Sequence, residues 1–243
     1  MTGSCRLCGK QKKLCNSHII PEWCYKPLYE DRHRFYELHP DGTSTLRRQQ
    51  GIREHLLCEC CEGRLNKWFE TPFHTYWFDL QRSPRVQAAA GAVTIPQFDY
   101  SIFKLFHLSI LWKASLSSDA YFRCVSLGPY EDKIRQLIWD RDPKPEDHYP
   151  LIGVLLVDEE EPRQVRCEFI TPPGRSRLFG CHAYSLSYIG CEWIWLVTDH
   201  PNPEVKRYSE WFARENGSML MRVKQWTESI GIKAFLDIGR KRR

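Results

Sequence analysis

The sequence predicts an α+β fold, in which a cysteine-rich module is followed by a domain of mixed helices and antiparallel sheet. Seven of the eleven cysteines fall within residues 1–97. Residues 100–117 are apolar nearly all round, as in a buried helix. Residues 151–199 hold four strand-like segments separated by turn residues. We therefore expect two domains, residues 1–97 and 98–243.

Local patterns predict the remaining elements. In the first part we expect a strand over 14–20, a short helix or turn over 21–29, a hairpin or excursion over 31–51, a helix over 61–69 and a connector over 83–97. In the second part we expect an amphipathic helix over 130–139 and strands over 151–158, 165–171, 178–188 and 191–199. Asn202 and Pro203 mark the start of a last helix. Residues 239–243 form a basic tail.

Composition narrows the class of protein. With 243 residues, 42% of them hydrophobic, nine Trp and twelve Phe, the chain can fill a substantial core. It contains no apolar run long enough to span a membrane and no signal-peptide pattern, so a cytoplasmic protein with reduced thiols is expected. A net charge of +5 permits contact with nucleic acid without requiring it.

Two Cys-x-x-Cys pairs, Cys5/Cys8 and Cys58/Cys61, are the strongest signal in the chain. Zinc takes four ligands tetrahedrally, and a two-residue spacer lets both thiolates of a pair reach one ion. Gly9 permits the backbone turn after the first pair, and the second pair opens the expected helix. A knuckle combined with a helix N-terminus is typical of a treble clef, so we expect a structural zinc there. A redox dithiol or two unrelated pairs are the alternatives.

Between these pairs lies the segment Ser17-His18-Ile19-Ile20-Pro21. Together with Cys5-x-x-Cys8-Gly9 and Leu56-Leu57-Cys58-x-x-Cys61-Glu62, it resembles the HNH endonuclease family, which has a zinc-stapled ββα-metal core. The resemblance covers about the first seventy residues. It implies that His18 is the general base that activates water against a phosphodiester, and that a divalent ion polarises the phosphate. From the residues alone, Cys15 and His18 form a third pair that either ligates zinc or leaves His18 free.

Glu62, Asn66 and Glu70 follow at helical spacing and therefore share one helix face. The chain has Ser17 where the family usually has Asp or His before the base, and Glu62 where it has a His after the second cysteine pair. Carboxylate and amide oxygens suit Mg²⁺ or Mn²⁺, so these three side chains are the expected ligands of a catalytic ion, with Glu62 and Asn66 as catalytic partners of His18. A solvated helix face is the alternative.

The resulting hypothesis is a metal-dependent endonuclease whose expected substrate is DNA. The resemblance also implies a phage-defence or mobile-element setting, in which small bacterial proteins of this layout often occur. The alternative is a non-catalytic zinc-binding module that binds nucleic acid or protein. The aromatic-rich second part leaves room for a homodimer interface or an unidentified protein partner. The basic side chains expected to contact phosphates are Lys12, Lys13, Arg53, Arg64 and Lys67.

Overall fold

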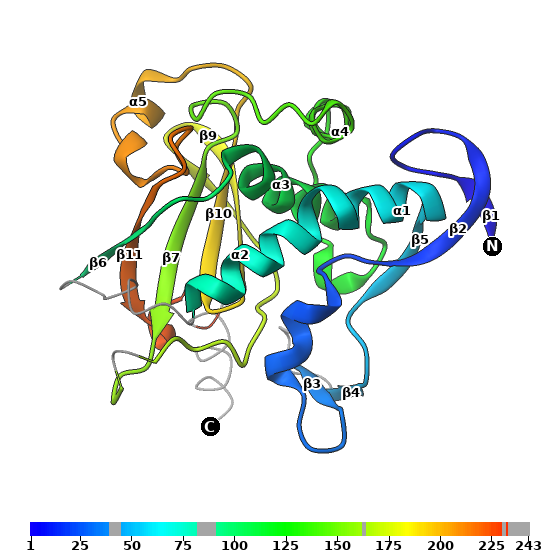
Figure 1. Ribbon diagram of the computed structural model, residues 1–243, viewed down its shortest axis with the longest axis horizontal. Coiled ribbons are helices and arrows are strands. Elements are labelled where there is room, and N and C mark those ends of the chain that lie inside the picture. The colour runs from blue at the N-terminus through cyan, green and yellow to red at the C-terminus, as the bar shows by residue number, and fades with distance from the viewer. Residues whose placement is uncertain (39–44, 82–90, 162–163, 230–231, 233–243) are drawn as a thin grey trace.

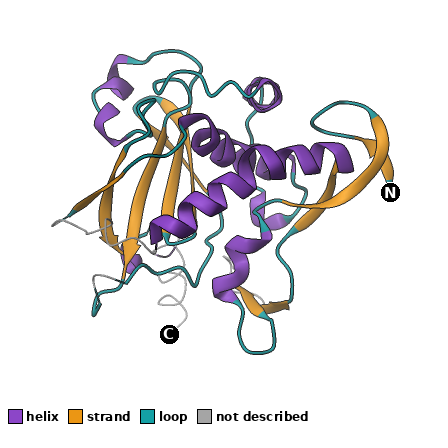
Figure 2. Ribbon diagram, viewed as in Figure 1, coloured by secondary structure: helices purple, strands orange, loops and turns teal. Residues whose placement is uncertain are grey.

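The computed structural model describes residues 1–38, 45–81, 91–161 and 164–229, together with Ile232. A small sheet lies at the N-terminal end of the molecule and a larger sheet at the other, and a long helix runs between them (Figures 1 and 2). The fold is therefore α+β, as predicted. Within the described residues, no helix combines the length and the apolarity needed to cross a membrane.

The N-terminal sheet has three strands in the order β1 (Thr2–Ser4), β2 (Gln11–His18) and β5 (Arg53–Cys58), all antiparallel. A 3₁₀ turn, η1 (Glu22–Leu28), follows β2, and a separate hairpin is formed by β3 (Phe35–Leu38) and β4 (Thr45–Arg48). The expected strand, turn and hairpin are thus present, although the tip of the hairpin lies outside the described residues.

The long helix has three parts: α1 (Glu59–Leu65), a π-helical stretch η2 (Asn66–Glu70) and α2 (Thr71–Gln81). The amide of Thr71 reaches back five residues to the carbonyl of Asn66. Pro72 accounts for the change, because proline lacks the N–H of an α-helical bond and its ring crowds the preceding turn. An i→i+5 turn rotates the residues that follow it, so a face drawn from α-helical spacing does not continue across η2.

Helix α3 (Tyr100–Leu116) is the centre of the core, and its side chains from Phe103 to Ala114 are all buried. Phe106 stacks on Phe73 of α2, with ring centroids 3.9 Å apart. On another side, His107 packs 3.9 Å from Trp193 of the large sheet. A single hydrophobic cluster therefore extends from the cysteine-rich module through α3 to the sheet.

The large sheet has the strand order β6-β11-β7-β10-β9-β8. All its pairings are antiparallel except that between β11 and β7, which is parallel. The bounds are β6 (Ala92–Ile95), β7 (Leu151–Val157), β8 (Gly174–Leu178), β9 (Cys181–Tyr188), β10 (Cys191–Val197) and β11 (Met219–Gln225). Smaller elements complete the chain: η3 (Ala120–Phe122), α4 (Tyr130–Asp140), α5 (Pro203–Lys206), η4 (Ser209–Trp211) and η5 (Trp226–Glu228).

Several sequence expectations need correction. Residues 165–171 are not a strand: Val165 makes one isolated bridge to Val157, and two prolines that cannot donate to a ladder follow at 172 and 173. Asn202 does cap a helix, but α5 is a single turn. Strand β6 falls inside the expected connector, and β11 was not expected at all. The basic tail, residues 239–243, lies outside the described residues.

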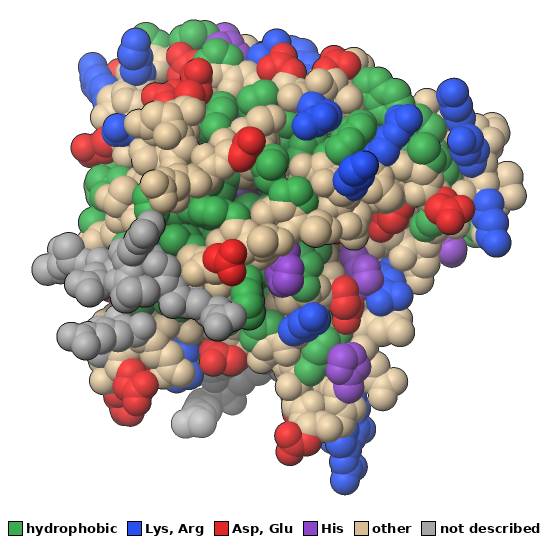
Figure 3. Space-filling view, viewed as in Figure 1, with side chains coloured by type: hydrophobic (Ala, Val, Ile, Leu, Met, Phe, Trp, Pro, Cys, Tyr) green, Lys and Arg blue, Asp and Glu red, His purple; other side chains and the backbone are tan. Residues whose placement is uncertain are grey.

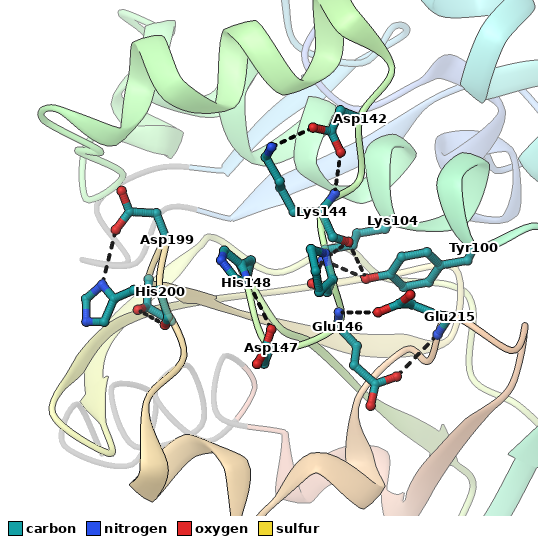
Figure 4. A network of polar contacts seen from close by, with 12 residues as sticks. Tyr100, Lys104, Asp142, Lys144, Glu146, Asp147, His148, Asp199, His200 and Glu215 are labelled. Carbon is teal, nitrogen blue, oxygen red and sulfur yellow. Dashed lines mark hydrogen bonds and ion pairs between the residues drawn. The ribbon is translucent and has the colours of Figure 1, made fainter.

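Lys104 is a buried lysine on α3, with 1% of its surface exposed. Its Nζ donates to the hydroxyl of Tyr100 at 2.8 Å and to the carbonyls of Pro145 and Lys144 at 2.8 and 3.4 Å (Figure 4). Burial lowers its pKa to about 7, against the opposing effect of four nearby carboxylates, Glu215, Asp147, Glu146 and Asp142. This ammonium therefore joins α3 to the loop after α4.

The buried lysine makes stability depend on pH. Because the pKa of Lys104 is about 7 in the folded protein and near 10.5 when exposed, the unfolded chain binds more protons between these values, and the free energy of unfolding rises with pH there. The slope is at most about 1.4 kcal/mol per pH unit. Relative to Lys104→Met, we expect the wild type to gain up to about 2 kcal/mol between pH 7.5 and 9 in urea titrations. The exposed control Lys206→Met should show no such gain, and an equal difference at both pH values for Lys104→Met would refute the linkage.

Candidate functional site

The first cysteine pair lies in the turn between β1 and β2. The amide of Gly9 donates to the carbonyl of Cys5 at 2.8 Å, and the amide of Cys5 donates to the carbonyl of Lys10 at 3.0 Å. Gly9 has φ +70°, a left-handed conformation that a side chain disfavours. The turn is thereby closed in the shape that points both thiols inward.

The second pair begins helix α1. Cys58 is the N-cap residue and Cys61 lies in the first turn. The amide of Cys58 donates to the Sγ of Cys5 at 3.3 Å, which joins the two pairs. The sulfurs of Cys5, Cys8, Cys58 and Cys61 all lie within 4.8 Å of one another.

This arrangement fits one tetrahedral metal ion. Zinc–sulfur bonds of about 2.3 Å would place the four sulfurs about 3.8 Å apart, which lies within the observed limit of 4.8 Å. Burial raises the pKa of the Cys61 thiol, and hydrogen bonds with neighbouring cysteines add to the effect. A divalent cation is what would offset that cost and stabilise the thiolates, so the cluster is compatible with structural zinc.

Cys15 and Cys60 lie outside this cluster. Cys60 is exposed on the helix, as expected for a bystander. Burial raises the pKa of the Cys15 thiol, and the neighbouring carboxylates of Glu62 and Glu59 raise it further. Of the two readings of the Cys15–His18 pair, the structure therefore favours the one in which His18 does not ligate the metal.

His18 ends strand β2 and faces Arg53, its cross-strand partner on β5. The Nε of Arg53 lies 2.7 Å from His18 Nε2, and Glu22 Oε2 lies 2.7 Å from the same nitrogen. All three side chains are part-exposed, at 21% for His18, 27% for Arg53 and 31% for Glu22. They form the His18–Glu22–Arg53 cluster, and Figure 3 shows histidine, acidic and basic side chains gathered on the face where η1 lies.

The two contacts to His18 Nε2 need opposite proton positions. The nitrogen accepts when Arg53 donates, and it must carry a proton to donate to Glu22. Burial lowers the pKa of His18, and the positive charges of Arg53 and Lys113 lower it further, while Glu22 raises it. At neutral pH the imidazole is therefore neutral. In the tautomer with its proton on Nδ1, Nε2 carries a lone pair and accepts from Arg53; in the other tautomer, Nε2 donates to Glu22.

Glu22 is held by several donors. It accepts from the amide of Gly51 at 3.2 Å and from the hydroxyl of Tyr29. These hydrogen bonds outweigh burial and keep the pKa of Glu22 below its usual value. Gly51 is required here, because a Cβ at this position would lie 2.3 Å from the ring of Tyr25. The carboxylate therefore stays charged beside His18.

Two of the three expected ligands of a catalytic ion have other partners. Glu70 Oε1 lies 3.0 Å from the Nζ of Lys113, which is 2% exposed. Asn66 Oδ1 accepts from Thr71 at 2.7 Å. Glu62 has one buried oxygen with no hydrogen-bond partner among the described residues. As a set, these side chains do not fit a Mg²⁺ or Mn²⁺ ion, because an ammonium and a hydroxyl occupy two of the three.

The five expected phosphate contacts are dispersed. Lys12 and Lys13 are exposed on β2, and Lys67 is exposed on η2. The guanidinium of Arg64 packs over the rings of Trp68 and Trp139, at 5.7 and 5.1 Å, so it serves the packing of α1 against α4. Of the five, Arg53 is the one that the structure brings to His18.

Sequence reasoning missed Glu22 and Lys113. Glu22 lies four residues after His18, and Pro21 is the signal for the 3₁₀ turn that begins at Glu22 and brings its carboxylate to the histidine. Lys113 interrupts an apolar helix, and a lysine in such a position signals a buried acidic partner.

No family model, curated protein or solved structure matches the chain. The site is therefore interpreted from its own geometry.

The cysteine cluster predicts that substitution of Cys58 lowers the zinc content of the protein, whereas substitution of its neighbour Cys60 does not. Replacing Cys58 with Ser removes one of the four thiolates and keeps the backbone amide that donates to Cys5, so we expect metal content to fall from about one zinc per chain to well below it. Chelation of the wild type should likewise unfold the module. Metal analysis of purified protein, with circular dichroism, measures both. The exposed Cys60→Ser variant is the matched control; equal metal content in the two variants would contradict the site.

Proposed function

We propose that this protein is a nuclease that cleaves nucleic-acid phosphodiester bonds, with His18 as general base and a structural zinc at the four cysteines. The observation that carries the proposal is the His18–Glu22–Arg53 cluster: a neutral imidazole, a guanidinium and a carboxylate meet at one nitrogen. The resemblance of the Ser-His-Ile-Ile-Pro segment to the HNH family points the same way.

Arg53 has the geometry of a phosphate-binding residue. Its guanidinium is permanently charged and offers a planar fork of donors that matches two phosphate oxygens. When a phosphate binds, the guanidinium gains a charged acceptor in place of the neutral imidazole. Nε2 of His18 is then released and can take a proton from the nucleophile.

Glu22 is the positioning residue in this scheme. Once Nε2 has gained a proton it becomes a donor, and the Glu22 oxygen at 2.7 Å is its acceptor. A charged carboxylate stabilises the imidazolium that forms, which lowers the barrier to proton transfer. Tyr29 and Gly51 hold the carboxylate for this role.

The expected Mg²⁺ or Mn²⁺ takes no step in this scheme, because two of its three expected ligands, Glu70 and Asn66, are held by Lys113 and Thr71. Its participation is tested by including chelator in the assay.

A second candidate function is a non-catalytic zinc module that binds nucleic acid or protein. Four groups converge on Glu22, and this favours a structural role in which His18 fastens β2 to the η1 turn. The two functions differ in what the loss of His18 does to activity and to stability.

The nuclease proposal predicts loss of cleavage in His18→Ala. Removal of a general base typically lowers the rate by about 10²–10⁴-fold. Wild type and variant are incubated with plasmid DNA and with RNA, each with Mg²⁺, Mn²⁺ or EDTA, and products are resolved on gels. The matched control is His55→Ala, on the exposed face of β5. Inactivity of the wild type on every substrate, or equal activity of His18→Ala and wild type at equal thermal stability, would refute the proposal.

The pH dependence of cleavage tests the role of Glu22. His18 acts as a base only when unprotonated, so the rate should rise with pH through a pKa below 6.5 and level off near neutrality. Because Glu22 raises that pKa, Glu22→Gln should move the rise to lower pH while lowering the plateau. Rate–pH profiles of the two proteins measure the shift. A profile that stays in place while the melting temperature falls would assign Glu22 a purely structural role.

A further inference from the structure

Positive charge around His18 comes from the protein itself. Arg53 lies 2.7 Å from its Nε2, and Lys113 also acts on it from helix α3. Lys113 is 2% exposed and Arg53 is about one-quarter exposed, so both sit in a partly desolvated site where their charges are weakly screened. A phosphodiester entering the cluster would meet one part-exposed cation, Arg53, while the buried Lys113 stays paired with Glu70.

Two of the three expected oxygen ligands of a divalent ion are occupied by donors, and the third, Glu62, keeps one buried oxygen without a hydrogen-bond partner among the described residues and acts on Cys15. Glu22 accepts from Tyr29 and Gly51, Glu70 faces the ammonium of Lys113, and Asn66 accepts from Thr71. Ser17 is buried at 1% exposure and ends in the core. An ion at this site would have to displace an ammonium or break the bonds that hold η1.

Guanidinium and ammonium groups neutralise phosphate charge, but they do not turn water into hydroxide as a bound metal does. The nucleophile must then be one that a neutral imidazole can activate. An alcohol already held next to the phosphorus meets this need, because intramolecular attack has effective molarities of about 10⁵ M or more in well-oriented systems. RNA carries such an alcohol at each 2′ position, and DNA does not.

We propose that the substrate is RNA, cleaved without a catalytic metal by attack of its own 2′-hydroxyl at the His18–Glu22–Arg53 cluster. This inference rests on the proposed nuclease function and specifies its substrate class. It replaces the expectation of DNA as substrate and of Mg²⁺ or Mn²⁺ as cofactor.

The reaction balances without a co-reactant other than water. His18 Nε2 takes the proton of the 2′-hydroxyl, the 2′ oxygen bonds to phosphorus, and the bond from phosphorus to the 5′ oxygen breaks. The 5′ oxygen takes a proton from water, and His18 returns its proton to the resulting hydroxide. The products are one strand ending in a 2′,3′-cyclic phosphate and another beginning with a 5′-hydroxyl. Arg53 donates to the non-bridging oxygens as their negative charge grows.

The test uses the intact zinc-containing protein and three oligonucleotides of one sequence: RNA, fully 2′-O-methylated RNA and DNA. Each is incubated with Mg²⁺ and, separately, with EDTA at a concentration that leaves the protein's zinc content unchanged. We expect cleavage of RNA alone, at rates equal within about twofold with and without Mg²⁺, and cyclic-phosphate ends by mass spectrometry. The His18→Ala variant should lose at least about 10²-fold, and His55→Ala should not.

The outcomes separate the two proposals. Cleavage of DNA or of 2′-O-methylated RNA that requires Mg²⁺ would overturn this inference and leave the nuclease function standing. RNA products ending in 3′-hydroxyl would do the same, because they require attack by water. Lack of cleavage of all three substrates by folded, zinc-loaded protein would overturn both. The Arg53→Lys variant keeps the positive charge but loses the planar set of guanidinium donors. If KM for RNA rises by a larger factor than kcat falls in this variant, Arg53 binds the phosphate.

Discussion

The convergence of four cysteine sulfurs on one point is the constraint on which the proposed site depends. Cys58 is both a member of that cluster and the last residue of β5, where it pairs with Leu14 of β2. The same strand pair places Arg53 opposite His18 four to five residues away. The register of this pair shifts by one residue at an irregularity between Leu14 and Asn16, and beyond that shift the pairing sets the guanidinium of Arg53 against the imidazole of His18. The cluster of sulfurs therefore holds one end of the strand pair whose other end carries His18 and Arg53.

Helix α3 links this module to the large sheet, and it carries two buried lysines. Lys104 and Lys113 are nine residues apart, which at about 100° per residue is two and a half turns. They leave the helix on opposite sides, Lys104 toward the loop after α4 and Lys113 toward Glu70. A buried ammonium is tolerated only where acceptors meet it, so each lysine fixes the position of the segment that supplies them. The two lysines therefore fix the otherwise apolar helix α3 relative to the loop after α4 on one side and to η2 on the other.

The sequence predicted those features of the structure that are set by residues close together in the chain. The cysteine spacing predicted the cluster, and the all-round apolar run predicted the burial of α3. It failed where distant residues decided the outcome: β11 pairs in parallel with β7, a strand some seventy positions earlier, and nothing within residues 219–225 announces that partner. The helix face of Glu62, Asn66 and Glu70 followed from α-helical spacing, but Pro72 imposes a π turn that redirects Glu70 to Lys113. Glu22 was overlooked because its role arises only after η1 folds back over β2.

The same residues explain why a resemblance to metal-dependent nucleases can coexist with a site that lacks their ligand set. The family's metal-binding position before the base is Ser17 here, which points into the core, and the helix carboxylate Glu70 is neutralised by Lys113. At the corresponding positions stand His18, the proposed base, and a cation on the facing strand, Arg53. A fixed cation can bind a phosphate and stabilise its transition state, but it cannot lower the pKa of water as a metal ion does. Under the proposed function, a scaffold that pairs the histidine with a guanidinium in place of a metal is therefore restricted to substrates that bring their own nucleophile, and among nucleic acids the 2′-hydroxyl would confine it to RNA.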